Sequence, residues 1–251
     1  MTHPHEPPAT AGGSSASRTD PVGVPVIGLA HGSRHPRGAE AIEALMTAVG
    51  SAAGVPAHAA YLDLAQPDLG AVVASLAAAG HRRAVVVPLL FTVAFHATVD
   101  VPQAVAEAAQ AYGVELVVSD ILGTGDDVAD VLRTALADAG VGAADDALLF
   151  AVGSSRPEAN AAVADLAARL ADGRAGDVRA AFGTCAPRAA DVLDDLTPPV
   201  ALWPLFLADG LLLDPLRRLS DERGWALVEP LAAQAAPLVL ARYAAARGRV
   251  T

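Results

Sequence analysis

The sequence predicts an α/β fold of two similar lobes, each a parallel sheet flanked by helices, and three observations predict it. Short apolar segments alternate with longer Ala-rich segments of helical periodicity, which is typical of βαβ units. Hydrophobic residues make up 53% of the 251 residues and aromatic residues only 4%. The core is therefore expected to consist mainly of Ala, Val and Leu, as in helices packed on buried strands. The order of segments then repeats once along the chain.

The first half of the chain predicts four strand–helix units in succession. The expected strands are residues 24–30, 56–61, 83–88 and 114–119, and the expected helices are residues 36–51, 68–79, 100–112 and 126–139. Asp126 follows a glycine and is predicted to cap the fourth helix. Because a helix follows every strand, we expect the strands to form a parallel sheet.

The second half repeats this order. The expected strands are residues 147–152, 177–182, 199–203 and 226–228, and the expected helices are residues 157–171, 186–196, 214–223 and 231–247. A segment rich in Gly, Ala and Asp joins the halves. We therefore predict an N-terminal lobe over residues 22–140 and a C-terminal lobe over 141–251. Residues 1–21 are rich in Pro, Ser, Thr, Gly and Ala and are predicted to form a disordered tail.

The two halves also align in detail, which indicates an internal duplication with a period of roughly 120 residues. The aligned segments are residues 30–34 with 151–155, 65–67 with 185–187, and 88–91 with 204–207. Polar side chains distinguish the halves. Val152 replaces His31, Gly183 replaces Asp63, and all seven histidines lie at or before His96. The chemistry is therefore predicted to lie in the first lobe.

Composition excludes several functions. The formal net charge is −11, and all 17 basic residues are Arg, so nucleic acid is not an expected partner and lysine chemistry is excluded. Cys185 is the single cysteine, which excludes an intrachain disulfide and fits the reducing cytoplasm. No apolar run reaches the length of a transmembrane helix, so no membrane partner is expected.

Two histidines follow ends of predicted strands. His31 directly follows the first strand, and His96 lies in a very apolar loop after the third. Ligands of open α/β sheets bind outside the carboxyl ends of strands, so both imidazoles are expected to face one crevice. We predict both as catalytic and metal-binding residues, with Phe95 contributing apolar surface for a flat substrate. The competing interpretations are a core histidine bonded to backbone for His31 and a buried loop histidine for His96.

Asp63 closes the second predicted strand and is a third catalytic candidate at the same edge. Two imidazoles and a carboxylate make an open site for a divalent transition metal. The competing interpretation is that Asp63 caps the turn before Pro67. Elsewhere, His58 lies early in a strand and is predicted to be structural. His81 precedes the amino end of a strand and is predicted at the surface.

The segment after the first histidine is the predicted substrate-binding turn. Gly32 permits a tight turn and close approach of a ligand. Ser33 stands at the start of a helix, where backbone N–H groups can hold an anion. Arg34, with His35 and Arg37 nearby, can pair with substrate carboxylates. A solvated helix start is the competing interpretation of this basic cluster.

Three motifs occur in order along the first half of the chain. They are Ala30-His31-Gly32-Ser33-Arg34, then Tyr61-Leu62-Asp63 with Pro67, and then Pro88-Leu89-Leu90 through His96 to Asp100-Val101-Pro102. With these motifs the chain resembles the sirohydrochlorin chelatases over nearly its whole length after the tail. The second half resembles the degenerate repeat of the long, two-lobed members of that family.

The resemblance implies two α/β lobes facing a cleft and a chelatase (lyase) activity. The family inserts Fe²⁺ or Co²⁺ into sirohydrochlorin on the routes to siroheme and cobalamin, and its two motif histidines match His31 and His96. Its members commonly carry Glu where this chain has Asp63. The shorter carboxylate retracts by one methylene, so contact with the metal would need a bridging water.

The resemblance also sets the expected partners. The divalent metal is a substrate, no permanent cofactor is expected, and the other substrate is a small-molecule tetrapyrrole. A monomer is expected, because the duplication supplies the second wall of the cleft within one chain. The sequence leaves two alternatives open: a non-catalytic metal or tetrapyrrole binding protein, and a chelatase for another tetrapyrrole.

Overall fold

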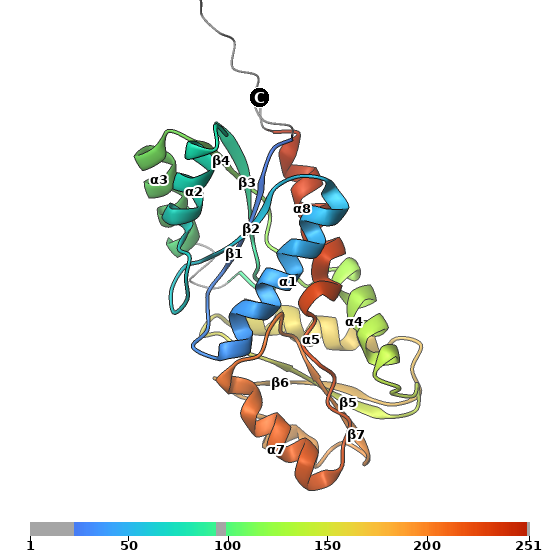
Figure 1. Ribbon diagram of the computed structural model, residues 1–251. Helices are drawn as coiled ribbons and strands as arrows, with labels where there is room; N and C mark the ends of the chain where they lie inside the picture. The colour runs from blue at the N-terminus through green and yellow to red at the C-terminus, as the bar shows by residue number, and fades with distance from the viewer. Residues whose placement is uncertain (1–22, 94–98, 250–251) are drawn as a thin grey trace, which may run out of the picture.

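The computed structural model describes residues 23–93 and 99–249, which form two parallel sheets with helices between and outside them (Figure 1). The predicted two-lobed α/β class is confirmed. The predicted tail, residues 1–21, lies outside the described residues. Among those that are described, none of the helices combines the length and the hydropathy that crossing a membrane requires.

The first sheet has the strand order β2-β1-β3-β4, and all its pairings are parallel. Its strands are β1 (Val26–Ala30), β2 (Ala57–Tyr61), β3 (Arg83–Pro88) and β4 (Glu115–Val118). Its helices are α1 (Pro36–Ala53), α2 (Leu69–Ala78), α3 (Val101–Tyr112) and α4 (Asp126–Asp138). Asp126 is the first residue of α4 and not its cap. Gly125 holds the N-cap position, and Asp126 lies in the first turn, where a carboxylate favours the helix dipole.

The second sheet has the order β6-β5-β7, also parallel. Its strands are β5 (Asp146–Ala151), β6 (Val178–Phe182) and β7 (Val200–Pro204), and its helical segments are α5 (Pro157–Ala171), α6 (Ala189–Leu193), η2 (Leu211–Leu213), α7 (Asp214–Arg223), η3 (Ala232–Ala235) and α8 (Ala236–Arg247). The predicted strand at 226–228 is reduced to a single bridge between Leu202 and Leu227. The predicted helix at 231–247 divides before Pro237, which occupies the first turn of α8 and has no N–H for a continuous helix.

The core consists of a shared inner cluster and one outer cluster for each sheet. The inner cluster joins both sheets to α1, α4, α5 and α8, which lie between the sheets in Figure 1. The outer clusters pack α2 and α3 on the first sheet and α6 and α7 on the second. One apolar cluster therefore runs through both lobes and packs them against each other.

The last helix of the chain packs on the first sheet. Helix α8 contacts α1 and β3, whereas α4 contacts α5 of the second lobe. Arg242 of α8 donates hydrogen bonds to the carbonyls of Ile121 (2.9 Å) and Leu122 and forms an ion pair with Asp127 at 2.7 Å. The hydroxyl of Tyr243 donates to the carbonyl of Val24. The predicted boundary between the lobes, at residues 140 and 141, stays a prediction. Helix α8 belongs to the second half of the sequence but packs on the sheet of the first half.

The duplication is visible in matching backbone hydrogen bonds at the strand ends. The N–H of Asp63 donates to the carbonyl of His31, and the N–H of Thr184 donates to the carbonyl of Val152, both at 2.9 Å. His31 therefore corresponds to Val152, as predicted. Asp63 corresponds to Thr184, so the predicted match with Gly183 is wrong by one position.

The one-residue error comes from the turn after each strand. Tyr61 donates its N–H to the carbonyl of Pro67, and Phe182 donates its N–H to that of Pro187. Both prolines follow cis peptide bonds, but the second turn contains one residue fewer. An alignment that matches Pro67 with Pro187 therefore pairs each residue between the strand and the proline with a residue one position too early in the second lobe.

Candidate active site

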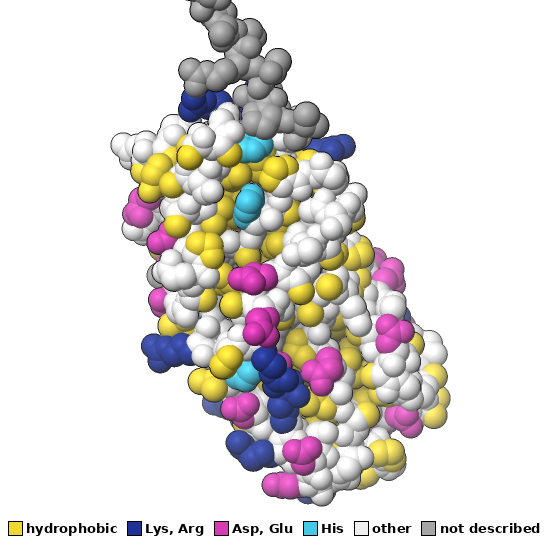
Figure 2. Space-filling model, in the orientation of Figure 1, with side chains coloured by type: hydrophobic (Ala, Val, Ile, Leu, Met, Phe, Trp, Pro, Cys, Tyr) yellow, Lys and Arg dark blue, Asp and Glu magenta, His cyan; other side chains and the backbone are white. Residues whose placement is uncertain are grey.

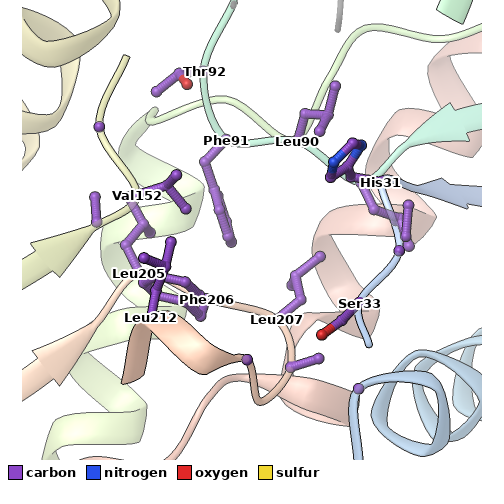
Figure 3. A pocket seen from close by; sticks show the side chains of 18 of the residues that line it. His31, Ser33, Leu90, Phe91, Thr92, Val152, Leu205, Phe206, Leu207 and Leu212 are labelled. Atoms are coloured by element: carbon purple, nitrogen blue, oxygen red, sulfur yellow. The ribbon is translucent and has the colours of Figure 1, made fainter. Parts of the chain in front are cut away.

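A cavity of about 790 Å³ opens at the carboxyl ends of the strands in both sheets (Figure 3). The first lobe contributes the residues after β1 and β3, and the second lobe contributes those after β5 and β7. Sites for organic cofactors and other small molecules commonly have volumes of about 300–1,000 Å³. The predicted location of the site, at one sheet edge between two lobes, matches this cavity.

His31 reaches the cavity from the end of β1. Its side chain is half-buried and lines the cavity, and Figure 3 shows it on the same side as Ser33. Gly32 has a φ of +100°, and a Cβ there would lie 1.8 Å from the carbonyl oxygen of Asp63. Only glycine fits this conformation and this approach, so Gly32 fixes the direction in which the chain leaves β1.

Ser33 and Arg34, two of the predicted substrate-binding residues, both line the cavity and differ in their contacts and exposure. The hydroxyl of Ser33 accepts a hydrogen bond from the N–H of His35 at 3.0 Å. Ser154 of the second lobe accepts from Arg156 in the same way, at 3.1 Å. A bond that both lobes keep belongs to the turn that starts the helix. Arg34 is exposed at the rim.

Asp63 lies beside the cavity and is not among its lining residues. Its backbone pairs with His31, but its exposed carboxylate accepts the N–H of Leu64 at 2.7 Å. The neighbouring Leu64 lines the cavity, while Asp63 borders a smaller hollow of about 400 Å³ that shares Tyr61 and Leu64 with it. The structure thus brings Asp63 to the predicted edge while its carboxylate bonds to its own turn.

His96 and Phe95 lie outside the described residues. The chain on both sides of them is placed: Phe91 and Thr92 line the cavity, and Val99 is exposed. In the part of the chain that the structure describes, no group of three or more His, Cys, Asp or Glu is arranged to hold a metal ion. The predicted pairing of His31 with His96 therefore stays a prediction.

The second lobe supplies a largely apolar wall. In Figure 3, Val152, Leu205, Phe206 and Leu212 lie across the cavity from His31. The ring of Phe206 stacks on Phe150 with centroids 6.1 Å apart, which fixes its orientation.

Half of the exposed large apolar side chains among the described residues line this cavity. Six are exposed among the described residues: Leu64, Val93, Val99, Tyr112, Val152 and Leu211. The first, fifth and sixth line the cavity, and the two valines Val93 and Val99 flank the segment that contains His96. An exposed apolar surface of this kind marks a site for an apolar partner or ligand.

Sequence reasoning missed two polar residues in the second lobe. Asn160 accepts the N–H of Ser154 and donates to its carbonyl, both at 2.8 Å, so its amide braces the turn after β5. Asp209, on the loop after β7, is the only acidic residue that lines the cavity among those described. Neither lies in a motif that the sequence analysis identified. The only sequence signal at Asp209 was an isolated polar residue within an apolar segment.

Two histidines lie on β2 and before β3, outside the residues that line the cavity. Burial and the nearby His81 lower the pKa of His58 below its ordinary value. His58 is half-buried on β2, and the structural role predicted for it stays a prediction. The predicted surface position of His81 is wrong, because only 6% of it is exposed. The cause is the tight turn after α2, in which the N–H of His81 bonds back to Leu76.

Comparison with known proteins relates this geometry to one family. The family model CbiX matches residues 25–139 and 146–222. Three solved structures are similar over most of the chain. SirB from Bacillus subtilis with Fe³⁺ is 22% identical, with a TM-score of 0.72 over 90% of this chain and 97% of that one; SirB from Bacillus subtilis subspecies spizizenii in complex with cobalt is 21% identical, with a TM-score of 0.74 over 89% of this chain and 95% of that one. CbiX, the terminal enzyme for biosynthesis of siroheme in denitrifying bacteria, is 23% identical, with a TM-score of 0.64 over 88% of this chain and 98% of that one. No curated protein sequence matches the chain. At these identities the structures establish a shared fold.

Proposed function

The chain belongs to the CbiX family, whose model matches most of its length, and on that premise we propose that it inserts Fe²⁺ or Co²⁺ into sirohydrochlorin. The observation that carries the proposal is the asymmetry of the cavity. One wall presents the imidazole of His31, and the opposite wall is largely apolar and lacks histidine. A flat macrocycle fits between them, with one face toward the imidazole.

Metal insertion exchanges two protons for one metal ion. The two pyrrole N–H protons leave the macrocycle, and ring nitrogens replace water molecules around the metal. A neutral imidazole has a lone pair that can accept a proton or bind a metal. In this proposal His31 and His96 guide the metal and accept protons on one macrocycle face, and Asp63 assists one of them.

The remaining site residues hold the macrocycle. Gly32 and Ser33 shape the turn that presents His31, Phe95 packs against the ring, and the exposed Arg34 pairs with a peripheral carboxylate. The metal enters and leaves as a substrate, and no permanent cofactor is needed. The SirB structures with Fe³⁺ and with cobalt support this choice of metals.

The proposed setting is the cytoplasm, with the chain acting as a monomer on a small-molecule substrate. The single cysteine supports a reducing compartment. Figure 2 shows acidic and basic side chains interspersed on one face, and the net charge of −11 disfavours nucleic acid as a partner. Both lobes contribute to the cavity, so one chain supplies a two-walled site.

The test is metal insertion in vitro, followed by the absorbance of sirohydrochlorin with Co²⁺, Fe²⁺ under anaerobic conditions, or Ni²⁺. We expect turnover with Co²⁺ or Fe²⁺ well above the rate without protein, and the preferred metal will indicate the siroheme or the cobalamin route. Tight binding without turnover would identify a carrier protein instead. Turnover restricted to another tetrapyrrole would identify a chelatase of a different route.

A further inference from the structure

One carboxylate joins the two lobes at the edge of the cavity. Asp209 belongs to the loop after β7, and its side chain is only 11% exposed. One of its oxygens lies 3.2 Å from Nε of Arg37 on α1, and the other accepts a hydrogen bond from Arg217 on α7. Arg37 stands between Arg34 and Gly38, which both line the cavity.

The two arginines at Asp209 differ in what they can still bind. The Arg217 side chain is 26% exposed and also contacts Glu229 at 3.2 Å. Burial alone would lower the pKa of Arg217, but the two carboxylates hold it above its ordinary value. The Arg37 side chain is 57% exposed, and within the described residues its one polar contact is made through Nε. The two Nη groups of Arg37 thus present a fork that suits a carboxylate.

A glycine on α1 allows the loop that carries Asp209 to lie close to the helix. A Cβ at Gly38 would lie 2.9 Å from Cβ of Ser33 and 3.3 Å from the carbonyl oxygen of Asp209, so glycine lets the loop of the second lobe approach α1. In the second lobe the residues that match Arg37 and Gly38 are Glu158 and Ala159. The arrangement is therefore a feature of one lobe and not of the repeated fold.

We propose that Arg37 binds a peripheral carboxylate of the tetrapyrrole at the cavity rim, and that Asp209 is the positioning residue that holds the Arg37 guanidinium in place. This inference rests on the proposed function. Arg34 is the only basic residue other than His31 that lines the cavity among those described. A substrate with several carboxylates needs further cations at the rim, and Arg37 is held beside that rim by the opposite lobe.

The experiment measures the affinity for metal-free sirohydrochlorin by the fluorescence of the macrocycle, so it does not depend on insertion. We expect Arg37→Gln to weaken binding about fivefold and Asp209→Asn about threefold, because a partly exposed ion pair contributes modestly. Asp209→Asn should add nothing in the Arg37→Gln background. Glu229→Gln removes the other carboxylate at Arg217 and is the matched control, with an affinity within about twofold of the parent.

Insertion kinetics and melting temperatures separate this role from a structural one. Arg37→Gln and Asp209→Asn should raise KM and leave kcat within about twofold, and Asp209→Glu should recover part of the lost affinity. Unchanged affinity in Arg37→Gln, an exposed position at which folding is not at risk, would overturn the inference while the proposed function stands. An equal effect of Asp209→Asn with or without Arg37 would overturn the positioning role. Failure of the parent protein to bind sirohydrochlorin would overturn the proposed function and this inference together.

Discussion

The ends of β1 and β5 have the same backbone and different side chains. Both strands lead into a glycine with positive φ, +100° at Gly32 and +87° at Gly153. In both, a serine hydroxyl then accepts the N–H two residues on, before a proline opens the helix. At the position before the glycine, however, His31 stands in one lobe and Val152 in the other. The residues that the turn requires are present in both lobes, whereas the residue that faces the cavity differs.

The loops after β3 and β7 differ in the same way. Leu89 and Leu205 continue their strands with equivalent hydrogen bonds to β1 and β5. The first loop then contains His96, whereas the second is shorter and passes through Asp209 into η2. The first lobe thus contributes imidazole side chains, and the second contributes a largely apolar wall and Asp209, which forms an ion pair with Arg37. The comparison predicts a single reactive lobe, and the following changes test it.

The largest expected effect is on catalysis by the first lobe. His31→Ala and His96→Ala should each lower the rate of metal insertion by at least about a hundredfold, the usual scale for loss of an acid–base group. Val152→Ala, at the matching place in the second lobe, should lower it by no more than about threefold. The measurement is the initial rate by absorbance, with circular dichroism to check folding. Near-parental rates in both histidine variants would show that the site is assigned wrongly.

The next effect concerns α8, the helix of the second half of the chain that packs on the first sheet. Arg242→Ala should lower the free energy of unfolding by about 2 kcal/mol, because it leaves two partly buried carbonyls without a donor. Arg247→Ala, also on α8 but exposed, is the control; it removes only the contact of the guanidinium with the ring of Tyr243 and should cost less than about 1 kcal/mol. Urea denaturation measures both. Equal losses would mean that α8 is not fixed through Arg242.

The stability lost in Arg242→Ala is also expected to depend on pH. The carboxylate of Asp127 loses water on burial, which alone would raise its pKa, but the hydrogen bond and charge of Arg242 lower the pKa overall. A carboxyl group whose pKa is lower in the folded state than in the unfolded state stabilises the folded protein at pH values above the unfolded-state pKa. This stabilisation is lost as the pH falls through the folded-state pKa. The Asp127 part of the difference between parent and Arg242→Ala should therefore be complete above about pH 5 and decline below about pH 4.

Asp63 is expected to matter less than the histidines. Asp63→Asn should reduce insertion by less than about tenfold, because the carboxylate bonds to its own turn and lies beside the cavity. Asp63→Glu should be tolerated or improve the rate, since the longer side chain reaches further. Thr184→Ala, at the matching place in the second lobe, serves as the control. A severe loss in Asp63→Glu would indicate a cleft built for the shorter carboxylate.

The smallest effect is expected at Gly38. Alanine usually stabilises a helix relative to glycine by up to about 1 kcal/mol. At Gly38 the new Cβ would lie 2.9 Å from Cβ of Ser33 and 3.3 Å from the carbonyl oxygen of Asp209 in the second lobe, so Gly38→Ala should instead lower the free energy of unfolding by about 1 kcal/mol. Gly70→Ala in α2, where the nearest atom is 3.4 Å away, should be neutral or stabilising. Similar urea midpoints for the two variants would contradict the close approach of the lobes.

Much of the fold followed from the sequence because local patterns determine it. The helices at Pro157–Ala171 and Asp214–Arg223 begin and end at the residues that the sequence pattern predicted, and the resemblance to chelatases is confirmed by the family match. The packing of α8 on the first sheet was not predictable, because periodicity shows that a helix has a buried face but not which surface covers it. Asp209 was missed for the same reason, since Arg37 is its partner only in three dimensions.

The most direct test of a single reactive lobe is the number of tight metal sites per chain. Titration with Co²⁺, followed by calorimetry, should give one tight equivalent, and this should disappear in the His31→Ala, His96→Ala double variant. Sedimentation of the same sample should give a mass near the 25.2 kDa of one chain. Two equivalent tight sites per chain, or one site that survives in the double variant, would contradict the assignment of the chemistry to the first lobe.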